Sequence, residues 1–171
     1  MRRWLLPAAL GLALAALAAL FVLSATPTFL MWLAMAKLDR AGSNRFAHGP
    51  LATDRSRIIV RPSPDLAYSS CPFDLSNGPV LVEMAPVPAP YWSLSVFDMR
   101  TDVAFVRNNR DTRGQAIRIA LAREGQQVPR GVEIVRLDYD RGVALMRILV
   151  ESRGGFASID RARRASRCVP V

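Results

Sequence analysis

The chain begins with a long apolar segment. Residues 4–23 contain no charged side chain. A helix of about twenty residues, at a rise of about 1.5 Å per residue, spans roughly 30 Å, which is the thickness of the hydrocarbon core of a bilayer. The apolar character resumes beyond Pro27 and continues to Leu38. The pattern therefore predicts a transmembrane helix and places the lipid bilayer in contact with residues 4–38.

A second apolar stretch, residues 28–38, follows Pro27. Its large apolar residues recur at helical spacing, namely Met31, Trp32, Met35 and Leu38. The stretch either continues the membrane helix after a kink at the proline or forms an amphipathic helix at the membrane interface. Residues 1–38 are accordingly predicted to be a membrane anchor with a juxtamembrane helix.

The same N-terminal segment has features of a secretory signal. A signal combines a basic start, an apolar stretch of roughly 7–15 residues and a cleavage site between small residues. Arg2 and Arg3 supply the basic start, and a peptidase could cut before Ala25, but the apolar stretch is longer than in a typical signal. We expect an uncleaved anchor, with a removed signal as the alternative.

The two cysteines bear on the compartment, because flanking charge does not decide the orientation. Basic residues lie on both sides of the anchor, whereas orientation follows from an excess on the cytoplasmic side. Cys71 and Cys168 could form one disulfide, which needs an oxidising compartment. We expect this disulfide because Cys168 lies in a polar, exposed-looking stretch near the C-terminus, where burial of a thiol has no other evident cause. Two unrelated buried thiols are the alternative. The disulfide favours a single-pass inner-membrane protein whose C-terminal domain lies in the periplasm.

Beyond a polar linker at residues 39–55, the period of the apolar positions changes to two. Residues 91–99 are the clearest case, since Trp92, Leu94 and Val96 fall on one face of a strand. A polar stretch at residues 61–79 is predicted to hold a short strand between two turns. The other predicted strands are residues 56–61, 80–84, 91–99, 104–106, 115–121, 132–139 and 143–150.

The end of the chain returns to helical periodicity. Residues 156–167 are predicted to form a helix whose apolar side packs on the sheet. Its exposed side would carry a cluster of arginines, namely Arg161, Arg163, Arg164 and Arg167. We therefore predict a β-rich α+β protein. An N-terminal transmembrane helix precedes a small antiparallel sandwich or curved sheet with a C-terminal helix, over residues 56–171.

The net charge of +9 raises the question of nucleic-acid binding. All but one of the 23 basic residues are arginines, and they are scattered over every segment beyond the anchor. A nucleic-acid footprint is instead a basic patch on one face. For the C-terminal cluster we expect a solvated helix face, with a membrane-surface contact as the alternative. No nucleic acid is predicted as a partner.

Several motifs together resemble the bacterial domain of unknown function 1254 family. They are V-R-P-S-P-D-L-A-Y-S-S-C-P-F-D-L-S-N-G-P-V-L-V-E-M, Y-W-S-L-S-V-F-D-M-R-T-D-V and V-A-L-M-R-I-L-V, which span about residues 44–168 in the family's order. The resemblance places Arg147 at the arginine of a family strand, while Ser63 and Asp102 replace asparagines. Longer members add a domain of unknown function 1214. The resemblance thus implies a short stand-alone form that works with a partner protein, for which a protein carrying that second domain is a candidate.

The catalytic residues are unknown from sequence, and Asp65, Tyr68 and Asp98 are the candidates. Carboxylates in a pocket can serve as general acid and base, and a tyrosine hydroxyl can donate in a cleft. Each has a structural alternative: Asp65 is an ordinary turn residue, Tyr68 can bury its ring, and Asp98 can lock an ion pair. The arginines available to Asp98 are Arg100, Arg107 and Arg147.

The remaining polar residues predict structure rather than chemistry. Asp74 and Gly78 are expected to shape the turn before residue 80, because an aspartate can hold backbone N–H groups. His48 is the only histidine and completes no catalytic triad. One histidine and two distant cysteines give no metal-ligand spacing, and no glycine-rich nucleotide loop is present. No metal and no cofactor are predicted.

Two functions of different classes follow. The first is a membrane-anchored periplasmic accessory or binding domain that acts with a partner protein. The alternative is an envelope enzyme acting on a small polar or carbohydrate-like substrate. Convergence of Asp65, Tyr68 and Asp98 on a cavity would favour the enzyme, whereas dispersed side chains, each satisfied by its own turn, would favour the binding domain.

Overall fold

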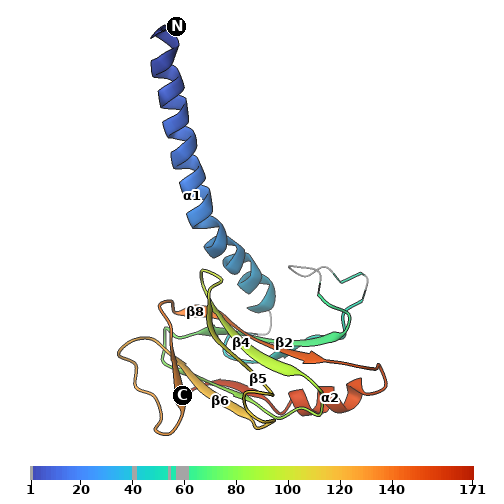
Figure 1. Ribbon diagram of the computed structural model, residues 1–171. Coiled ribbons are helices and arrows are strands. Elements are labelled where there is room, and N and C mark those ends of the chain that lie inside the picture. Colours follow the sequence, from blue (N-terminus) through green and yellow to red (C-terminus); the bar gives the residue numbers. More distant parts are fainter. Residues whose placement is uncertain (1, 40–41, 54, 57–61) are drawn as a thin grey trace.

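The computed structural model describes residues 2–39, 42–53, 55–56 and 62–171 (Figure 1). A short 3-10 helix (Arg2–Trp4) leads into α1 (Leu5–Leu38), and a second helix, α2 (Phe156–Arg163), lies near the C-terminus. The strands are β1 (Ala47–His48), β2 (Leu66–Asp74), β3 (Val80–Met84), β4 (Trp92–Asp98), β5 (Val103–Asn108), β6 (Ile117–Ala122), β7 (Glu133–Arg136), β8 (Arg141–Leu149) and β9 (Arg167–Pro170). The β-rich α+β fold predicted from the sequence is confirmed.

The predicted and observed strands differ mainly at the ends of the domain. The predicted strand at residues 56–61 lies, beyond Ser56, outside the described residues. β2 occupies nine residues rather than a short segment, because it pairs along its whole length with β8. β9 has no counterpart in the prediction, since its formation depends on pairing with β3, far away in the sequence.

The strands form two sheets that pack face to face (Figure 1). Sheet A has the order β1-β2-β8-β4-β5 and is antiparallel throughout. Sheet B has the order β7-β6-β3-β9 and is antiparallel except for the parallel pair β6 and β7. The hydrophobic core of the domain lies between the two sheets. The predicted inward face of β4 is part of this core. Large fully buried side chains include Phe73, Leu75, Met84, Trp92, Leu94, Ile119, Leu121, Met146 and Ile148.

The outer face of sheet A carries the side chains that alternate with the core residues. Strand register places Tyr68, Arg147, Ser93 and Asn108 opposite one another across four neighbouring strands. A second row across the strands, at the residue of β8 that precedes Arg147 by four positions, contains Val143 and Phe97. We refer to this surface below as the outer face of sheet A.

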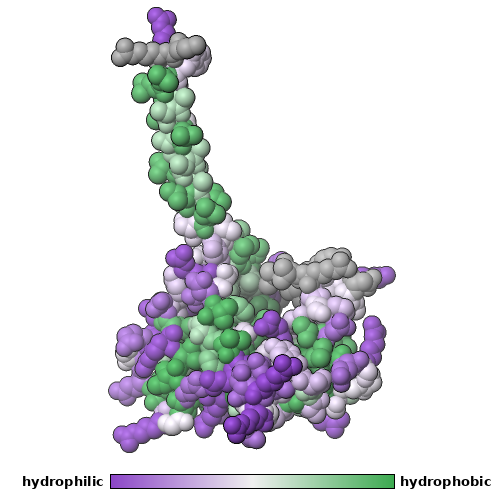
Figure 2. All heavy atoms as spheres, viewed as in Figure 1, coloured by the Kyte–Doolittle hydropathy of each residue, from purple (hydrophilic) through white to green (hydrophobic). Residues whose placement is uncertain are grey.

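Helix α1 ends on the outer face of sheet A. Met31 and Met35 are 6% and 7% exposed and pack with Val143, next to the partly buried Phe97 and Met99. Residues 5–23 are exposed, and the helix runs away from the sandwich on this side (Figures 1 and 2). Among the described residues, α1 is the helix that is long and apolar enough to cross a membrane.

Pro27 lies inside α1 without ending it. Of the two predicted roles for residues 28–38, the structure therefore has the continuation of the first helix rather than a separate interfacial helix. The last turns of this continuous helix then become part of the domain's own packing, through Met31 and Met35.

Residues 42–53 are built into the sandwich, so the prediction of a linker over residues 39–55 is wrong for this part. Ala47 and His48 form β1 and pair with Ser70 and Ser69 of β2. The side chain of Asn44 forms two hydrogen bonds with the backbone of Asp74. Its oxygen accepts from the Asp74 N–H at 2.8 Å, and its amide nitrogen donates to the Asp74 carbonyl at 3.1 Å. A two-residue strand leaves no periodic signal in the sequence.

Candidate functional site

Asp65 and Asp98, two of the predicted catalytic candidates, lie at opposite ends of β8. Asp98 pairs with Gly142 near the start of that strand, whereas Leu66, next to Asp65, pairs with Leu149 at its end. The strand between Gly142 and Leu149 spans roughly 23 Å at about 3.3 Å per residue. The structure does not bring these two carboxylates to a common site.

Asp98 holds the tight connection between β4 and β5. Its Oδ1 accepts hydrogen bonds from the backbone N–H groups of Arg100, at 2.7 Å, and Asp102, at 3.0 Å. Within the described residues Asp98 forms no ion pair, and Arg107 is paired with Glu133 instead. The carboxylate therefore organises a turn, as short acidic side chains commonly do.

Tyr68 and Asp65 lie closer together, around the start of β2. The hydroxyl of Tyr68 accepts a hydrogen bond from the Ser63 N–H at 3.0 Å. The backbone carbonyl of Asp65 accepts from the Val150 N–H at 2.9 Å and extends the β2 and β8 pairing by one bond. Tyr68 also faces the same side of sheet A as Arg147, its register partner on β8.

Asp74 lies at the C-terminal end of β2 and shapes the following turn. Its Oδ1 accepts hydrogen bonds from the Ser76 hydroxyl and, at 3.0 Å, from the Ser76 N–H, and its Oδ2 accepts from Arg141 Nε at 2.8 Å. Burial acts to raise the pKa of this carboxyl, but the Ser76 and Arg141 hydrogen bonds outweigh it and leave the pKa below the ordinary value. Gly78 completes the turn at a φ of +137°, which favours glycine.

A disulfide joins the two sheets. Cys71 of β2 in sheet A and Cys168 of β9 in sheet B are linked at an S–S distance of 2.03 Å, with Cα atoms 6.5 Å apart. The polar surroundings of Cys168 in the sequence suggested exposure, but both cysteines are buried because β9 is a strand of sheet B. Together with the apolar helix α1, the disulfide indicates an envelope or extracytoplasmic location.

Arg163 of α2 is 1% exposed, so the prediction that all the C-terminal arginines form a solvated face is wrong for this residue. Its guanidinium donates to the carbonyl oxygens of Tyr68, at 2.7 Å, and Gly49, at 2.6 Å, and pairs with Asp160 at 2.5 Å. One buried side chain thus ties α2 to β2 and to the segment after β1. Helical spacing puts Arg163 on the side of Phe156 and Ile159, four residues beyond Ile159, but the pattern of α2 does not indicate the acceptors that allow a charged side chain to be buried there.

His48 lies beside this arginine, and its Nδ1 shares a hydrogen bond with the Ser69 hydroxyl at 2.9 Å. Burial is the main cause that lowers the pKa of His48, and the positive charges of Arg163 and Arg164 lower it further. The neutral ring is therefore the form that the folded chain favours.

Arg147, Ser93 and Ser95 form a second polar group, on the outer face of sheet A. Arg147 Nη2 donates to the Ser95 hydroxyl at 3.1 Å. Arg147 Nε and the Ser93 hydroxyl are buried, and neither has a hydrogen-bond partner within the described residues. The sequence missed the two serines, because serines that alternate with apolar residues are expected to face solvent.

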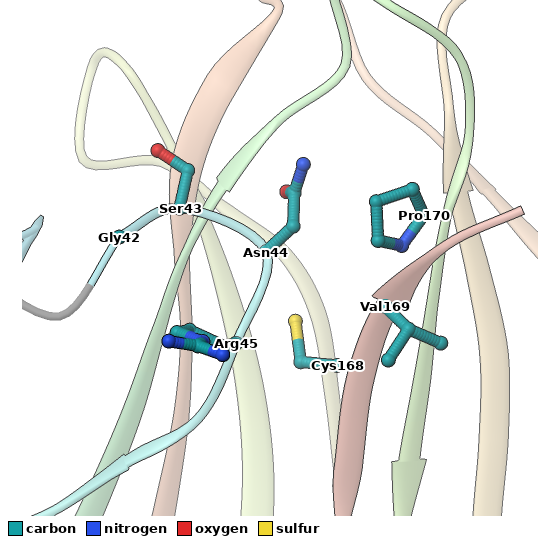
Figure 3. A pocket seen from close by; sticks show the side chains of 7 residues that line it. All are labelled: Gly42, Ser43, Asn44, Arg45, Cys168, Val169 and Pro170. Carbon is teal, nitrogen blue, oxygen red and sulfur yellow. The ribbon is translucent and has the colours of Figure 1, made fainter.

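A shallow hollow of about 450 Å³ lies beside the disulfide (Figure 3). Asn44 and Arg45 lie on one side of it, and Val169 and Pro170 of β9 lie on the other, with Cys168 between them. The described residues that line it include no carboxylate and no histidine, so they supply no general base. Elsewhere in the described part of the chain, no three His, Cys, Asp or Glu side chains are grouped closely enough to hold a metal ion.

Comparison with known proteins gives a family and a fold. Residues 43–170 match the family described as "Protein of unknown function (DUF1254)". The VPA0106 protein from Vibrio parahaemolyticus has a similar structure, with a TM-score of 0.62 and 18% identity over 84% of this chain and 38% of that one. An uncharacterized protein from Burkholderia cenocepacia gives a TM-score of 0.49 and 16% identity over 83% of this chain and 39% of that one.

The two solved structures set limits on what can be transferred. This chain spans about two fifths of the length of each of them. At 18% identity, the similarity to the Vibrio parahaemolyticus protein concerns the fold alone. A comparison with curated proteins gives no match.

Proposed function

The chain belongs to the DUF1254 family of proteins of unknown function, and from this premise we propose that it is a membrane-anchored periplasmic domain that binds a partner rather than catalysing a reaction. In this proposal α1 is an uncleaved, single-pass anchor in the inner membrane. The domain beyond it lies on the periplasmic side, close to the membrane surface.

The packing of α1 carries the proposal. Residues 5–23 are exposed and uncharged, and a helix of this length matches the hydrocarbon core of a bilayer. The last turns of the same helix bury Met31 and Met35 against Val143. A cut before Ala25 would fall inside this continuous helix. The packing of the end of α1 against the domain therefore favours a retained anchor over a removed signal.

The disulfide supports the periplasmic side. A bond between Cys71 and Cys168 persists in an oxidising compartment such as the bacterial periplasm, and is rare in the cytosol. Arg2 and Arg3, before the apolar segment, would then lie on the cytoplasmic side, where basic residues are enriched.

The dispersal of the candidate side chains favours binding over catalysis. Asp65 and Asp98 lie at opposite ends of β8, and Asp98 and Tyr68 are each engaged by a nearby backbone N–H group. General acid and base catalysis needs such groups within hydrogen-bond reach of one substrate. The envelope-enzyme alternative would require a site built from other residues.

The partner is the least constrained part of the proposal. The resemblance to the family makes a protein carrying a domain of unknown function 1214 the candidate. Purification of the tagged full-length chain from its own membranes, followed by mass spectrometry, tests it. Recovery of such a protein in proportion to the bait would support this partner, and its absence from the recovered proteins would refute it.

Protease protection tests the anchor and the compartment. We expect a tag placed after Val171 to be digested in intact spheroplasts, and the chain to resist extraction from membranes by carbonate. Mass spectrometry should find residues 1–24 still attached. A matched variant that lacks these residues should be released from the membrane. A tag protected in spheroplasts and digested only after lysis would refute the periplasmic assignment, and a mature N-terminus at Ala25 would refute the anchor.

A further inference from the structure

Among the described residues of the sandwich, Arg147 is the partly buried arginine that has no carboxylate partner. Of the arginines in the described part of the sandwich, four are buried or partly buried. Three of these pair with acidic side chains: Arg107 with Glu133, Arg123 with Asp140, and Arg163 with Asp160. Within the same residues Arg147 forms no ion pair, and its one hydrogen bond is to Ser95. A charge that is partly removed from water normally has a counter-charge.

The donors around Arg147 are only partly used. A guanidinium has five N–H donors, and one of them is engaged here, by the hydroxyl of Ser95. Nε is buried without a partner. Ser93, the register partner of Arg147 on β4, is 0% exposed, and its hydroxyl is also unpartnered. Orphaned buried polar groups are rare in native proteins, and two on neighbouring strands indicate a ligand that accepts hydrogen bonds.

The position of this group relative to α1 indicates where the ligand comes from. Arg147 lies on the outer face of sheet A, the same face that receives Met31 and Met35. Met31 follows the uncharged exposed segment by eight residues, which is about 12 Å along a helix axis. The headgroup layer next to the hydrocarbon core occupies about 5–7 Å of that distance, and a tilt of the helix shortens it further. A long arginine side chain can bridge the remainder.

Beside the polar row that contains Arg147, the edge of this face carries exposed apolar side chains on β5. Val106 lies opposite Ser95 on the edge strand β5, and Val103 lies opposite Phe97, next to the seat of α1. These two valines are 60% and 57% exposed. A single cation beside exposed apolar side chains suits the boundary between phosphate and acyl chains in a bilayer. A site for a soluble anion would be expected to lack this apolar margin.

We propose that Arg147, together with Ser93 and Ser95, binds the phosphate group of an anionic phospholipid from the leaflet beneath which the domain lies. The guanidinium donates to phosphate oxygens with the paired geometry that arginine favours, and the Ser93 hydroxyl donates one further hydrogen bond. The valines of β5 contact the adjoining acyl region. The proposal rests on the proposed role of α1 as a membrane anchor, but it does not depend on which side of the membrane the domain occupies.

Native mass spectrometry of the full-length chain in detergent tests the site. The chain is incubated with phosphatidylglycerol or with phosphatidylcholine, and the lipid-bound fraction is measured. We expect the native chain to retain phosphatidylglycerol preferentially and Arg147→Gln to bind it about 10- to 100-fold more weakly, as for the loss of a hydrogen bond to a charged group. Arg118→Gln is the matched control, because Arg118 lies on β6 of sheet B, with 59% of its side chain exposed, and pairs with Glu83. It should bind phosphatidylglycerol like the native chain.

A second variant guards against a folding defect. Thermal unfolding shows whether Arg147→Gln is folded, and if it is not, Ser93→Ala carries the test with an expected loss of about tenfold. Unchanged binding by a folded Arg147→Gln, or by Ser93→Ala in its place, would overturn the proposal. Displacement of the lipid by inorganic phosphate at equal concentration would also overturn it, in favour of a soluble anion.

The outcomes separate this proposal from the proposed function. A native chain that retains neither lipid, while Arg147→Gln abolishes co-purification of a protein, would overturn the lipid site and assign Arg147 to a protein contact. Loss of lipid binding in the variant supports the site whether or not protease protection places the domain in the periplasm. A cytoplasmic domain would refute the proposed function and leave the binding measurement unaffected.

Discussion

Replacement of Arg163 by alanine is the sharpest test of how this sandwich is held together. The guanidinium is buried and donates hydrogen bonds to two backbone carbonyl groups, those of Gly49 and Tyr68, as well as to Asp160. These acceptors belong to three separate parts of the chain. Arg163→Ala removes the donors but leaves the acceptors where they are, so the segment after β1, strand β2 and helix α2 lose their common partner.

The magnitude follows from the buried groups that lose their partners. The Gly49 carbonyl loses its donor, and a buried acceptor left unsatisfied costs about 1–3 kcal/mol. The Tyr68 carbonyl keeps a hydrogen bond from the Gly49 N–H at 3.1 Å and loses only the bond to the guanidinium, which is worth about 1.5–3 kcal/mol. Removal of one partner from a buried ion pair typically costs about 3–5 kcal/mol. Asp160 keeps a second arginine, Arg164, at 2.7 Å and is partly exposed, which limits its share of the loss. We therefore expect Arg163→Ala to lower the free energy of unfolding by about 3–5 kcal/mol. For a domain of this size that corresponds to roughly 6–20 °C in Tm.

Tryptophan fluorescence during thermal unfolding of the full-length chain in detergent measures this change. Trp92 is 1% exposed and reports on the core, whereas Trp4, just before α1, and Trp32, on α1, are exposed. Arg164→Ala is the matched control, because Arg164 contacts the same Asp160 but has 55% of its side chain exposed. Exposed ion pairs contribute about 0–1 kcal/mol, so its Tm should change little. Equal shifts for the Arg163 and Arg164 variants would refute the role assigned to the buried hydrogen bonds.

Three further predictions concern the disulfide, a glycine and the histidine. Reduction of the bond between Cys71 and Cys168, which closes a loop with a sequence separation of 97, should lower the stability by about 4–5 kcal/mol on the chain-entropy model, as read from Tm with and without dithiothreitol. A double alanine variant should not respond to the reductant, and a response would point to another cause. Gly142→Ala should lower the free energy of unfolding in urea by about 3 kcal/mol. A Cβ at this position would collide with the Phe97 carbonyl oxygen and lie 2.5 Å from the Phe73 ring. Gly154→Ala is the control and should be neutral, because a Cβ there meets nothing within 4 Å. The pKa of His48 is lowered in the folded chain, so the unfolded chain binds the proton more readily than the folded chain does. The contribution of His48 to stability is therefore complete above the ordinary histidine pKa of about 6.5, and it is lost as the pH falls toward the folded-state pKa. His48→Gln should remove this dependence, and a variant that loses stability below about pH 6.5 as the native chain does would contradict it.

The candidate site shows where sequence reasoning worked and where it did not. The family resemblance drew attention to Arg147, and the residues themselves to Asp65, Tyr68 and Asp98. Local turn chemistry accounts for Asp98, whose carboxylate binds N–H groups two and four residues ahead. Nothing local identifies Ser93 as a buried orphan, because that depends on the neighbouring strand β8 and on the arginine opposite.

Arg163 of helix α2 likewise shows that local sequence patterns do not reveal distant partners. Helical spacing places Arg163 on the side of Ile159, but the sequence gives no acceptor for a guanidinium buried there. Helix α2 turns Arg163 towards the carbonyl groups of Tyr68 and Gly49, which lie 95 and 114 residues away in the chain. The partners that make burial favourable are therefore invisible to any local pattern.

The sequence by itself determined the parts of this protein that depend on neighbouring residues. The uncharged run of residues 4–23 sets the apolar helix, the alternation in residues 91–99 sets which face of β4 enters the core, and Asp74 and Gly78 provide the chemistry of a turn. These features follow from helix rise, strand periodicity and backbone preference, all of which act over a few residues. The tertiary structure alone decided how the sheets are ordered, that α1 ends against Val143, and that β1 and β9 exist. It also decided that Arg163 has buried partners, while Arg147 has no acidic partner in the described part of the chain. Those outcomes depend on contacts between residues far apart in the chain, where burial and pairing outweigh local preference.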